Sequence, residues 1–446
     1  MKMQANRQTR RIIVRLLSNL GSRQEVAQYL KRYSDLDEMK FAVVKVGGGI
    51  LEHHMKELCS SLTFLQQVGL TPIVIHGAGP QLSRELQEAG IQSETVDGFR
   101  VTSPEILRVA RRVFQRENLR LTDALNNAGT QAASITGGVF EAEVLDEQRY
   151  GMVGKVSTVN IEPLRSAVRA HVIPVISPLA ETTGGQILNI NADVAANKLV
   201  ESVQPFKIIF LTSTGGILNA NENIIPSINL STDFERLMNE NWLHSGMRVK
   251  LQQVNDMLRQ LPLDSSVSIT TPELLARELF THRGSGTLVR LGERIITHDS
   301  WDSVDKARLR ELLETSFGKS LAQDYFDSTK LKVAYVSEAY RAAALITQGD
   351  GVDYLDKYAV TEKAQGEGLG GAVWRAIKAK HPALYWRARP DNAVNSFYFR
   401  EADGFMKSGG WLVFWYGLAS LPDIERLVKQ AAAAPATMTG ADVGEA

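Results

Sequence analysis

Short apolar runs alternate with longer segments of helical period between Phe41 and about Ile269, and this alternation limits the possible folds most strongly. The runs are apolar almost throughout rather than at every second residue, which is typical of strands buried on both faces of a parallel sheet. Helices with capping signals separate them, as at Ser103 followed by Pro104. The alternation predicts an α/β fold with a doubly wound, mainly parallel sheet. The predicted strands span residues 41–46, 72–76, 172–176, 207–212 and 267–270.

The sequence changes character after His282. Residues 332–337, 341–347 and 352–360 are three strand-like runs joined by short turns, which predicts successive antiparallel strands in a smaller α+β domain. A chain of 446 residues has room for it, since domains average about 150 residues. The predicted divisions are N-terminal helices (1–34), the α/β domain (35–285), a linker (286–299), the α+β domain (300–430) and a disordered tail (431–446), whose Ala, Gly, Thr and Pro bury little.

The first 24 residues hold no acid and carry five arginines around an apolar stripe at helical spacing. Such a segment is typical of a mitochondrial transit peptide or of a helix that docks on another subunit. Ser22 and Glu25 form a capping box for a second helix, with Val26, Tyr29 and Tyr33 on one face. Two tandem helices favour docking, so we expect a homo-oligomer. We expect a cytoplasmic protein, or a mitochondrial one if the source is eukaryotic.

Composition excludes several classes of function. The 50 basic residues balance the 50 acidic ones, which argues against nucleic acid or an anionic membrane surface as a partner. No apolar run approaches the length of a membrane span. Cys59 is the only cysteine, which excludes an internal disulfide and an all-cysteine zinc site. His53 and His54 are adjacent rather than one helical turn apart, so we expect a solvated pair and predict no metal site.

Glycines follow three of the predicted strands. Lys45 lies inside the first strand, just before Gly47 and Gly48, and the second strand ends in HGAGP, which contains Gly77 and Ala78. Backbone amides at such strand ends can approach a phosphate closely, although glycines there also serve ordinary turns. Thr212 opens a third loop of this kind, TSTGG. A lysine in a buried strand requires an anion, and its place before the glycines distinguishes these loops from a P-loop.

Polar residues elsewhere in the first domain complete a possible anion site. Arg100 can hold a carboxylate with two hydrogen bonds, although a solvated arginine is the commoner case. Asn189 and Asp193 lie on an extended segment where alternate residues would face one cleft, but Asn191 or Asp193 could equally cap the helix that follows. Lys250 falls on the first turn of another predicted helix.

These motifs together resemble the N-acetylglutamate kinase branch of the amino-acid kinase family. Lys45 with its glycines, HGAGP, FRVT at 99–102, NINAD at 189–193 and GMRVK at 246–250 occur in the family's order. The resemblance implies ATP-dependent phosphorylation of a side-chain carboxylate, with Mg²⁺ on the nucleotide. It implies that Lys45 and Lys250 face the transferring phosphoryl group and that Asp193 orients both. It also implies backbone contacts to phosphate at the loops of Gly47, Gly48, Gly77, Ala78 and Thr212, and substrate binding by Arg100 and Asn189.

Two positions depart from the family pattern. Ala78 and Ser245 stand where glycine is usual. A backbone donor survives the change from glycine to alanine only if the φ angle there is negative. The phosphate contact that the resemblance implies at Ala78 therefore requires a negative φ there.

The second domain carries another glycine-rich loop before a helix. Residues 365–370 (QGEGLG) follow the third antiparallel strand and open a helix at 371–378, and consecutive amides there can hold a pyrophosphate. Together with residues 385–399 and the aromatic strand 411–416, this loop resembles GNAT-type N-acetylglutamate synthase domains. The resemblance implies acetyl-CoA bound by Gln365, Gly366, Glu367, Gly368, Leu369 and Gly370.

The same resemblance assigns roles to four residues of the second domain. Lys357 and Arg387 would bind the carboxylates of glutamate, and Asn392 and Tyr398 would serve direct acetyl transfer. The aromatic neighbours of Tyr398 also allow a core residue without a chemical role.

The two resemblances together imply a bifunctional enzyme that acetylates glutamate and then phosphorylates N-acetylglutamate. The alternatives are a synthase whose kinase fold only binds an effector, and a kinase whose acetyltransferase domain is regulatory. Retention of Lys45, Asp193 and Lys250 argues against the first alternative. We also expect L-arginine to inhibit through Glu278 and Gly284, although an interdomain hinge would explain these residues equally well.

Overall fold

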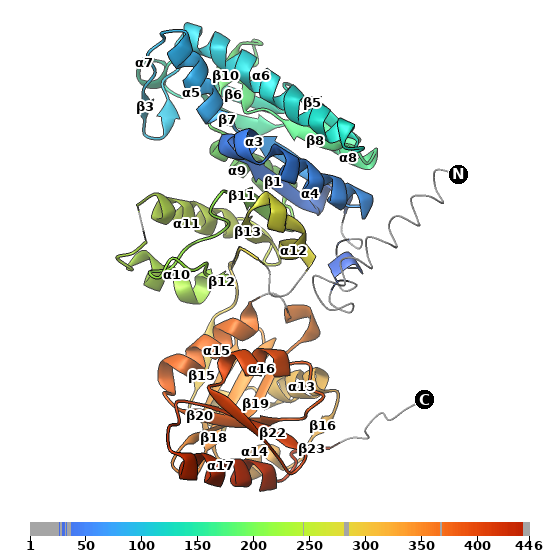
Figure 1. Cartoon of the computed structure of the whole chain (residues 1–446), viewed down its shortest axis with the longest axis vertical. Coiled ribbons are helices and arrows are strands. Elements are labelled where there is room, and N and C mark those ends of the chain that lie inside the picture. The colour runs from blue at the N-terminus through green and yellow to red at the C-terminus, as the bar shows by residue number, and fades with distance from the viewer. Residues whose placement is uncertain are drawn as a thin grey trace, which may run out of the picture. The chain divides into compact units, whose positions relative to one another are not determined.

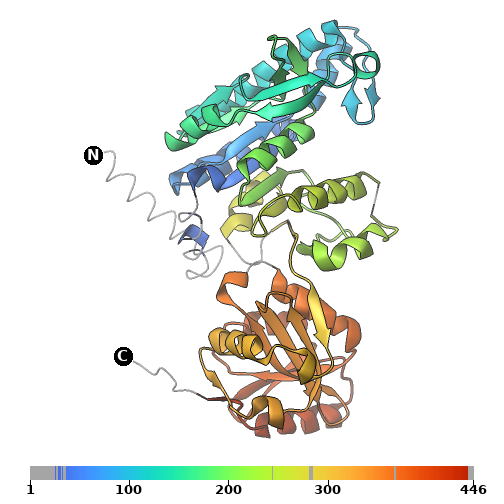
Figure 2. The same cartoon turned by 180° about the vertical axis from the view of Figure 1, so that it is seen from behind.

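The computed structural model describes residues 26, 29–31, 33, 37–243, 245–280, 285–365 and 368–439. The chain divides into two compact units (Figures 1 and 2). The N-terminal unit extends to Leu230 and from Phe234 to Leu291, and the C-terminal unit contains Ser231–Asp233 and everything from Gly292. Within the described part of the chain, no helix is long and apolar enough to cross a membrane.

An eight-stranded sheet forms the centre of the N-terminal unit, in the order β12-β14-β13-β11-β1-β2-β8-β5. Neighbouring strands are parallel except for β13 and β14. All five predicted strands are in this sheet, so the fold class is confirmed. The strands are β1 (Ala42–Val46), β2 (Ile73–His76), β5 (Ala132–Ile135), β8 (Ile173–Ile176), β11 (Lys207–Leu211), β12 (Ser227–Asn229), β13 (Ser266–Thr270) and β14 (Thr287–Arg290).

Helices cover both faces of this sheet. Val43 enters one apolar cluster with residues of the helices α8, α9, α10 and α11, whereas its neighbour Val44 enters another with residues of α3, α4, α6 and α12. Burial on both sides explains why the strands are apolar throughout. The helices are α3 (Gly48–His53), α4 (Met55–Gln67), α5 (Gly79–Glu88), α6 (Pro104–Asn127), α7 (Glu147–Tyr150), α8 (Glu162–Arg169), α9 (Ala192–Val203), α10 (Leu230–Met238), α11 (Ser245–Leu258) and α12 (Leu275–Phe280).

A second sheet in this unit was not predicted. It has the order β10-β9-β6-β7, from Ile187–Asn189, Leu179–Glu181, Phe140–Val144 and Gly154–Val159, and a separate hairpin joins β3 (Thr95–Val96) to β4 (Phe99–Arg100). Alternate residues of β6 and β7 are exposed, so these strands lack the continuous apolar run that identifies the central ones. Ser103 caps α6 as predicted, its hydroxyl accepting from the Ile106 amide at 3.2 Å.

The C-terminal unit is built on a seven-stranded sheet, β15-β17-β18-β19-β20-β22-β21, in which only β19 and β20 are parallel neighbours. The three predicted antiparallel strands are confirmed. The strands are β15 (Ile295–His298), β17 (Leu331–Ser337), β18 (Ala342–Gln348), β19 (Asp353–Val360), β20 (Leu384–Ala388), β21 (Gly404–Ser408) and β22 (Trp411–Tyr416). The helices are α13 (Lys306–Phe317), α14 (Tyr325–Ser328), α15 (Leu369–Lys380), α16 (Asn395–Glu401) and α17 (Leu421–Ala433).

Two predicted boundaries differ from the structure. The expected linker 286–299 contains β14 of the N-terminal unit and β15 of the C-terminal unit, because each strand completes an edge of its sheet. The expected disordered tail begins too early. The helix α17 continues to Ala433, and β23 (Met438–Thr439) pairs with β16 (Ser320–Leu321). Residues 440–446 lie outside the described residues.

The described residues of the predicted second helix pack into the N-terminal unit itself. Val26, Tyr29 and Tyr33 are buried in the apolar cluster around Val44, and the Tyr33 hydroxyl donates to the Leu279 carbonyl at 2.6 Å. The remainder of the predicted segment 1–34 lies outside the described residues.

Candidate active sites

A lysine and a carboxylate meet at the carboxyl end of the central sheet. Lys45 on β1 places its Nζ 2.7 Å from Oδ1 of Asp193, which stands in the first turn of α9. Asn191 caps that helix, its side chain accepting from the Asp193 amide at 2.8 Å, so the capping alternative is correct for Asn191. The Asp193 side chain remains 48% exposed, so the pair is accessible.

The charge of Lys250 interacts with the charges of Lys45 and Asp193. Lys250 lies in the second turn of α11 rather than in the predicted first turn. Its Nζ is 5.7 Å from the centre of the Phe210 ring. Burial lowers the pKa of Lys250, the charge of Lys45 lowers it further, and Asp193 opposes both effects. Among the described residues, no carboxylate lies within ion-pair distance of Lys250. The site therefore has two cations and one carboxylate, an excess positive charge suited to phosphate.

The glycine-rich loops on either side approach each other closely. A Cβ at Gly48 would lie 2.7 Å from Oε1 of Gln81 and 2.8 Å from Cδ of Pro80, so no larger residue fits there. Ala78 has a φ of −144°, so it meets the condition under which alanine can replace glycine at this backbone donor. The amide of Gly77 donates to the Val46 carbonyl at 2.9 Å, so its expected role as a phosphate donor is wrong.

A neutral histidine, which sequence reasoning did not single out, supports the second loop. His76 is fully buried at the end of β2, and burial lowers its pKa to about 4. The Asn118 amide nitrogen donates to the Val175 carbonyl at 2.9 Å and lies 3.2 Å from His76 Nε2. Nε2 therefore accepts, which leaves the imidazole proton on Nδ1, 3.4 Å from the Gly77 carbonyl.

Arg100 lines a cavity of about 390 Å³ together with residues of α5 and the segment that follows it. Its guanidinium donates to the hydroxyls of Ser83, at 2.7 Å, and Ser93. No described acidic residue pairs with the Arg100 guanidinium, so it is available to bind a carboxylate ligand. Asn189 is buried, and its side-chain amide donates to the Thr102 hydroxyl at 3.0 Å. That hydroxyl in turn donates to the Arg100 carbonyl at 2.7 Å.

Two other predicted residues support loops. The Thr212 hydroxyl accepts from the Gly215 amide at 3.1 Å, which closes the turn after β11. Glu278 is buried, and its Oε2 accepts from the amides of Ser285 at 2.7 Å and Gly286 at 3.0 Å. Gly284 lies outside the described residues.

In the C-terminal unit, α15 begins directly after the predicted glycine-rich loop. Gly368 precedes the helix with a φ of +76°, which favours glycine, and a Cβ at Gly370 would lie 2.8 Å from the Tyr358 hydroxyl. Leu369 is buried in the core, and the Gln365 amide donates to the Thr361 carbonyl at 3.1 Å. Gly366 and Glu367 lie outside the described residues. The first-turn amides of this twelve-residue helix have no partners within it and suit a pyrophosphate.

The strands β19 and β20 pair with each other only from Asp353–Leu384 to Leu355–Trp386. Beyond these residues the two strands diverge, and each remains paired only with its other neighbour. The two predicted carboxylate-binding residues follow this divergence. Lys357 is buried, with its Nζ 2.8 Å from Oδ2 of Asp356 and 2.6 Å from the Thr437 hydroxyl. Asp356 is the extra residue of a β-bulge, a feature that sequence spacing does not reveal.

Arg387 has backbone partners on the other side of the divergence. Its Nη1 donates to the carbonyls of Ala431 and Ala434, both at 2.7 Å, and its Nη2 donates to the Pro435 carbonyl at 2.9 Å. The guanidinium also lies 4.1 Å from the centre of the Trp411 ring. Sequence reasoning missed these partners because it predicted no order after residue 430.

Tyr398 on α16 is buried among aromatic rings, including Trp386 at 5.5 Å between ring centres. Burial raises its pKa, so the phenol stays protonated. Among the described residues, the structure records no hydrogen bond to its hydroxyl. Oδ1 of Asn392 accepts from the Val394 amide at 3.1 Å, which leaves the Asn392 amide nitrogen to donate elsewhere.

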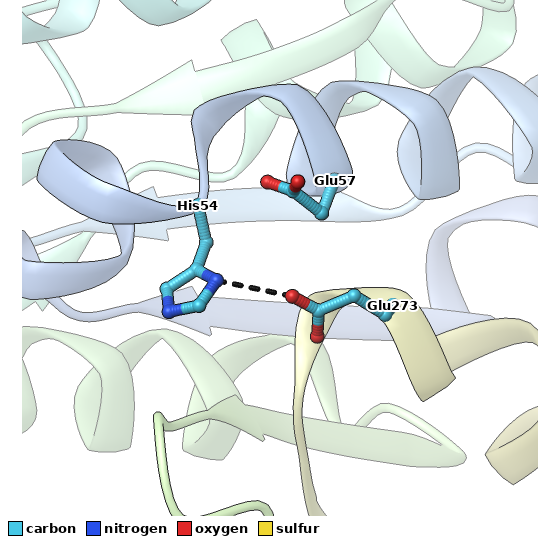
Figure 3. A group of neighbouring side chains, drawn as sticks. All are labelled: His54, Glu57 and Glu273. Atoms are coloured by element: carbon cyan, nitrogen blue, oxygen red, sulfur yellow. Dashed lines mark hydrogen bonds and ion pairs between the residues drawn. The ribbon is translucent and has the colours of Figure 1, made fainter.

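One group of side chains in the described part of the chain has metal-ligand character: His54, Glu57 and Glu273 (Figure 3). His54 Nδ1 lies 3.0 Å from Oε1 of Glu273, so His54 is paired rather than simply solvated. Each of the three side chains is partly exposed, and no buried unpartnered ligand points into the group. The ion pair itself accounts for the arrangement.

Comparison with known proteins agrees with the geometry of both units. The sequence model of the amino acid kinase family matches residues 40–264, about half of the chain. The chain belongs to the amino acid kinase family. Residues 296–434 match the N-acetyltransferase domain of N-acetylglutamate synthase.

Relatives of known name align over most of the chain. The acetylglutamate kinase of Xanthomonas campestris pv. campestris is 55% identical over 426 residues, 94% of this chain and all of that protein. The human mitochondrial N-acetylglutamate synthase is 30% identical and aligns over 89% of this chain and 72% of that protein.

A solved structure has the same fold. The N-acetylglutamate synthase of Neisseria gonorrhoeae, complexed with coenzyme A and N-acetyl-glutamate, has a TM-score of 0.59 at 18% identity and covers 89% of this chain and 98% of that one. The same enzyme complexed with coenzyme A and L-arginine has a TM-score of 0.56 at 17% identity.

Proposed function

We propose that this chain is a bifunctional enzyme of arginine biosynthesis, which acetylates L-glutamate with acetyl-CoA and phosphorylates N-acetyl-L-glutamate with ATP. The observation that carries the proposal is the presence of two built sites, the Lys45–Asp193 pair with Lys250 and the divergence of β19 and β20 beside α15. The two domain matches and the names of the relatives support the same two reactions.

In phosphoryl transfer, Lys45 and Lys250 would neutralise the charge on the transferring group, and Asp193 would hold Lys45 in place. Arg100 would bind a carboxylate of N-acetylglutamate, and buried Asn189 would position that site through Thr102. Asp193 is the one carboxylate in this group and is already paired, so Mg²⁺ would be held mainly by phosphate oxygens of ATP. The ion would supply further neutralisation of phosphate charge.

In acetyl transfer, the first turn of α15 would hold the pyrophosphate of acetyl-CoA. The neutral amine of glutamate would attack the thioester directly, the C–S bond would break, and the protonated Tyr398 would give its proton to the leaving thiolate. The nitrogen would lose its extra proton to water, and the phenolate would be reprotonated from solvent. The free amide nitrogen of Asn392 would donate to the thioester oxygen, and Lys357 and Arg387 would bind the carboxylates of glutamate.

We further propose that L-arginine inhibits the enzyme through the segment around Glu278. The complex of the Neisseria synthase with L-arginine supports arginine as an effector in related proteins. Oε2 of Glu278 is used by two loop amides, so a cationic ligand would pair with Oε1. A homo-oligomer and a cytoplasmic location remain predictions from sequence.

Two separate assays on the purified full chain test the proposal. CoA release requires L-glutamate and acetyl-CoA, and ADP release requires N-acetylglutamate and ATP. We expect both activities. An enzyme that releases only CoA would be a synthase with a regulatory kinase fold, and one that releases only ADP would be a kinase with a regulatory second domain.

A further inference from the structure

The last described part of the chain crosses from one half of the C-terminal unit to the other. We call residues 434–439 the strap. It leaves α17, which packs against β20, β21 and β22, and ends in β23, which pairs with β16. The strand β16 contacts α13, which packs against β18 and β19. The strap therefore joins the elements that cover β20 to the elements that cover β19, the two strands that diverge.

The strap and the end of α17 hold both predicted carboxylate-binding cations. Arg387 donates to the carbonyls of Ala431 and Ala434 at 2.7 Å and to that of Pro435 at 2.9 Å. Lys357, which lies on β19 rather than on the β20 of Arg387, contacts the Thr437 hydroxyl at 2.6 Å. One short segment thus reaches both positive side chains beyond the divergence.

These contacts occupy the donors that a carboxylate bound end-on to Arg387 would use. A carboxylate bound end-on to arginine takes one hydrogen from Nη1 and one from Nη2. Both Nη1 hydrogens of Arg387 are already donated to carbonyls, as is one from Nη2. On Lys357, the Asp356 carboxylate and the Thr437 hydroxyl accept at 2.8 and 2.6 Å, and the Asp356 carbonyl lies 3.4 Å from Nζ. The strap and a dicarboxylate substrate therefore compete for the same groups.

We propose that the strap is a self-blocking segment, which must leave Arg387 and Lys357 before glutamate binds. The inference rests on the proposed acetyl transfer. A charged carboxylate makes a stronger hydrogen bond to a cation than a neutral carbonyl or hydroxyl does, so glutamate can displace the strap. The apparent affinity for glutamate is then reduced by the fraction of molecules whose strap is closed.

A reversible disulfide tests this competition. Ser320 faces Thr439 in the β16–β23 register, and opposed residues of antiparallel strands lie close enough for a disulfide. In oxidised Ser320→Cys/Thr439→Cys, with the bond verified by mass, we expect KM for glutamate to rise at least tenfold and to recover on reduction. ADP release and oxidised Ser320→Cys alone should match wild type. A wild-type KM in the oxidised double variant would overturn the proposal.

Hydrogen exchange gives an independent readout on the wild-type chain. We expect L-glutamate with CoA to speed exchange of the amides of residues 434 and 436–439, whereas unchanged or slower exchange would overturn the strap proposal. CoA release measured on the same sample separates the two ideas. Strap opening without CoA release refutes the proposed acetyl transfer alone, and CoA release with an unchanged strap refutes the competition alone.

Discussion

The two units differ in how many groups of the protein contact the cations of the proposed sites. In the N-terminal unit, Lys45 has one partner, the half-exposed Asp193, and no carboxylate is within ion-pair distance of Lys250 among the described residues. In the C-terminal unit, Lys357 pairs with the carboxylate of Asp356 at 2.8 Å and also contacts the Thr437 hydroxyl, and Arg387 is covered by three backbone carbonyls. In our proposal, the phosphate site of the N-terminal unit is open to its ligand, whereas the glutamate site of the C-terminal unit is closed by the strap.

The largest expected effect concerns the C-terminal site. Positioned acid–base groups contribute about 100- to 10,000-fold, so Tyr398→Phe should lower the rate of CoA release by that order. The variant keeps the ring and its packing against Trp386, so the protein should stay folded. Tyr385→Phe is the control for loss of a buried tyrosine hydroxyl, because that hydroxyl only donates to Gln430, at 3.1 Å, and has no proposed part in proton transfer. Equal rates in the wild type and a folded Tyr398→Phe protein would make Tyr398 a packing residue only.

A slightly smaller effect should appear at the N-terminal site. Lys45→Ala and Lys250→Ala each remove a positive group from the phosphoryl position, which typically costs about 100- to 1000-fold in turnover. ADP release should fall by that amount while CoA release is retained. Lys155→Ala, at an exposed lysine of β7, should leave both rates unchanged. Wild-type ADP release by either site variant would show that its lysine has no part in the reaction.

Arginine inhibition provides a third comparison. Loss of a hydrogen bond to a charged group costs about 1.5–3 kcal/mol, so Glu278→Gln should weaken inhibition by roughly 10- to 100-fold. Arginine is titrated into wild type, Glu278→Gln and a chain that begins at Asp35, with both activities recorded. Equal inhibition in all three would exclude Glu278 and the N-terminal helices as the site. No inhibition of wild type would exclude the regulation as well.

The smallest effect is on stability and comes from His76. Its pKa falls from 6.5 to about 4 on folding, so between these values the unfolded chain binds more protons and stability decreases as the pH falls. Between pH 7 and pH 5, the loss from this group is about 2 kcal/mol. Denaturant unfolding should show that His76→Asn lacks this part of the pH dependence. His171→Asn, at an exposed histidine, should retain it. An identical pH dependence in His76→Asn would refute the neutral buried imidazole.

Sequence predicted the central strands of both units, because burial on both faces leaves continuous apolar runs such as 208–211. It missed the half-exposed β6 and β7, and it missed β23, whose two residues carry no period. Lys45, Asp193 and Lys250 could be grouped from motifs. The partners of Lys357 and Arg387 could not, because a β-bulge at Asp356 and a crossing segment from residue 434 onward depend on tertiary structure.

The most direct test of two separate sites in one chain is a coupled time course. Purified wild-type protein is given L-glutamate, acetyl-CoA and ATP, and CoA, N-acetylglutamate and ADP are measured together. The account predicts that CoA appears at once and that ADP follows after a lag that shortens when N-acetylglutamate is added at the start. ADP release without acetyl-CoA, or CoA release with no ADP at any time, would contradict it.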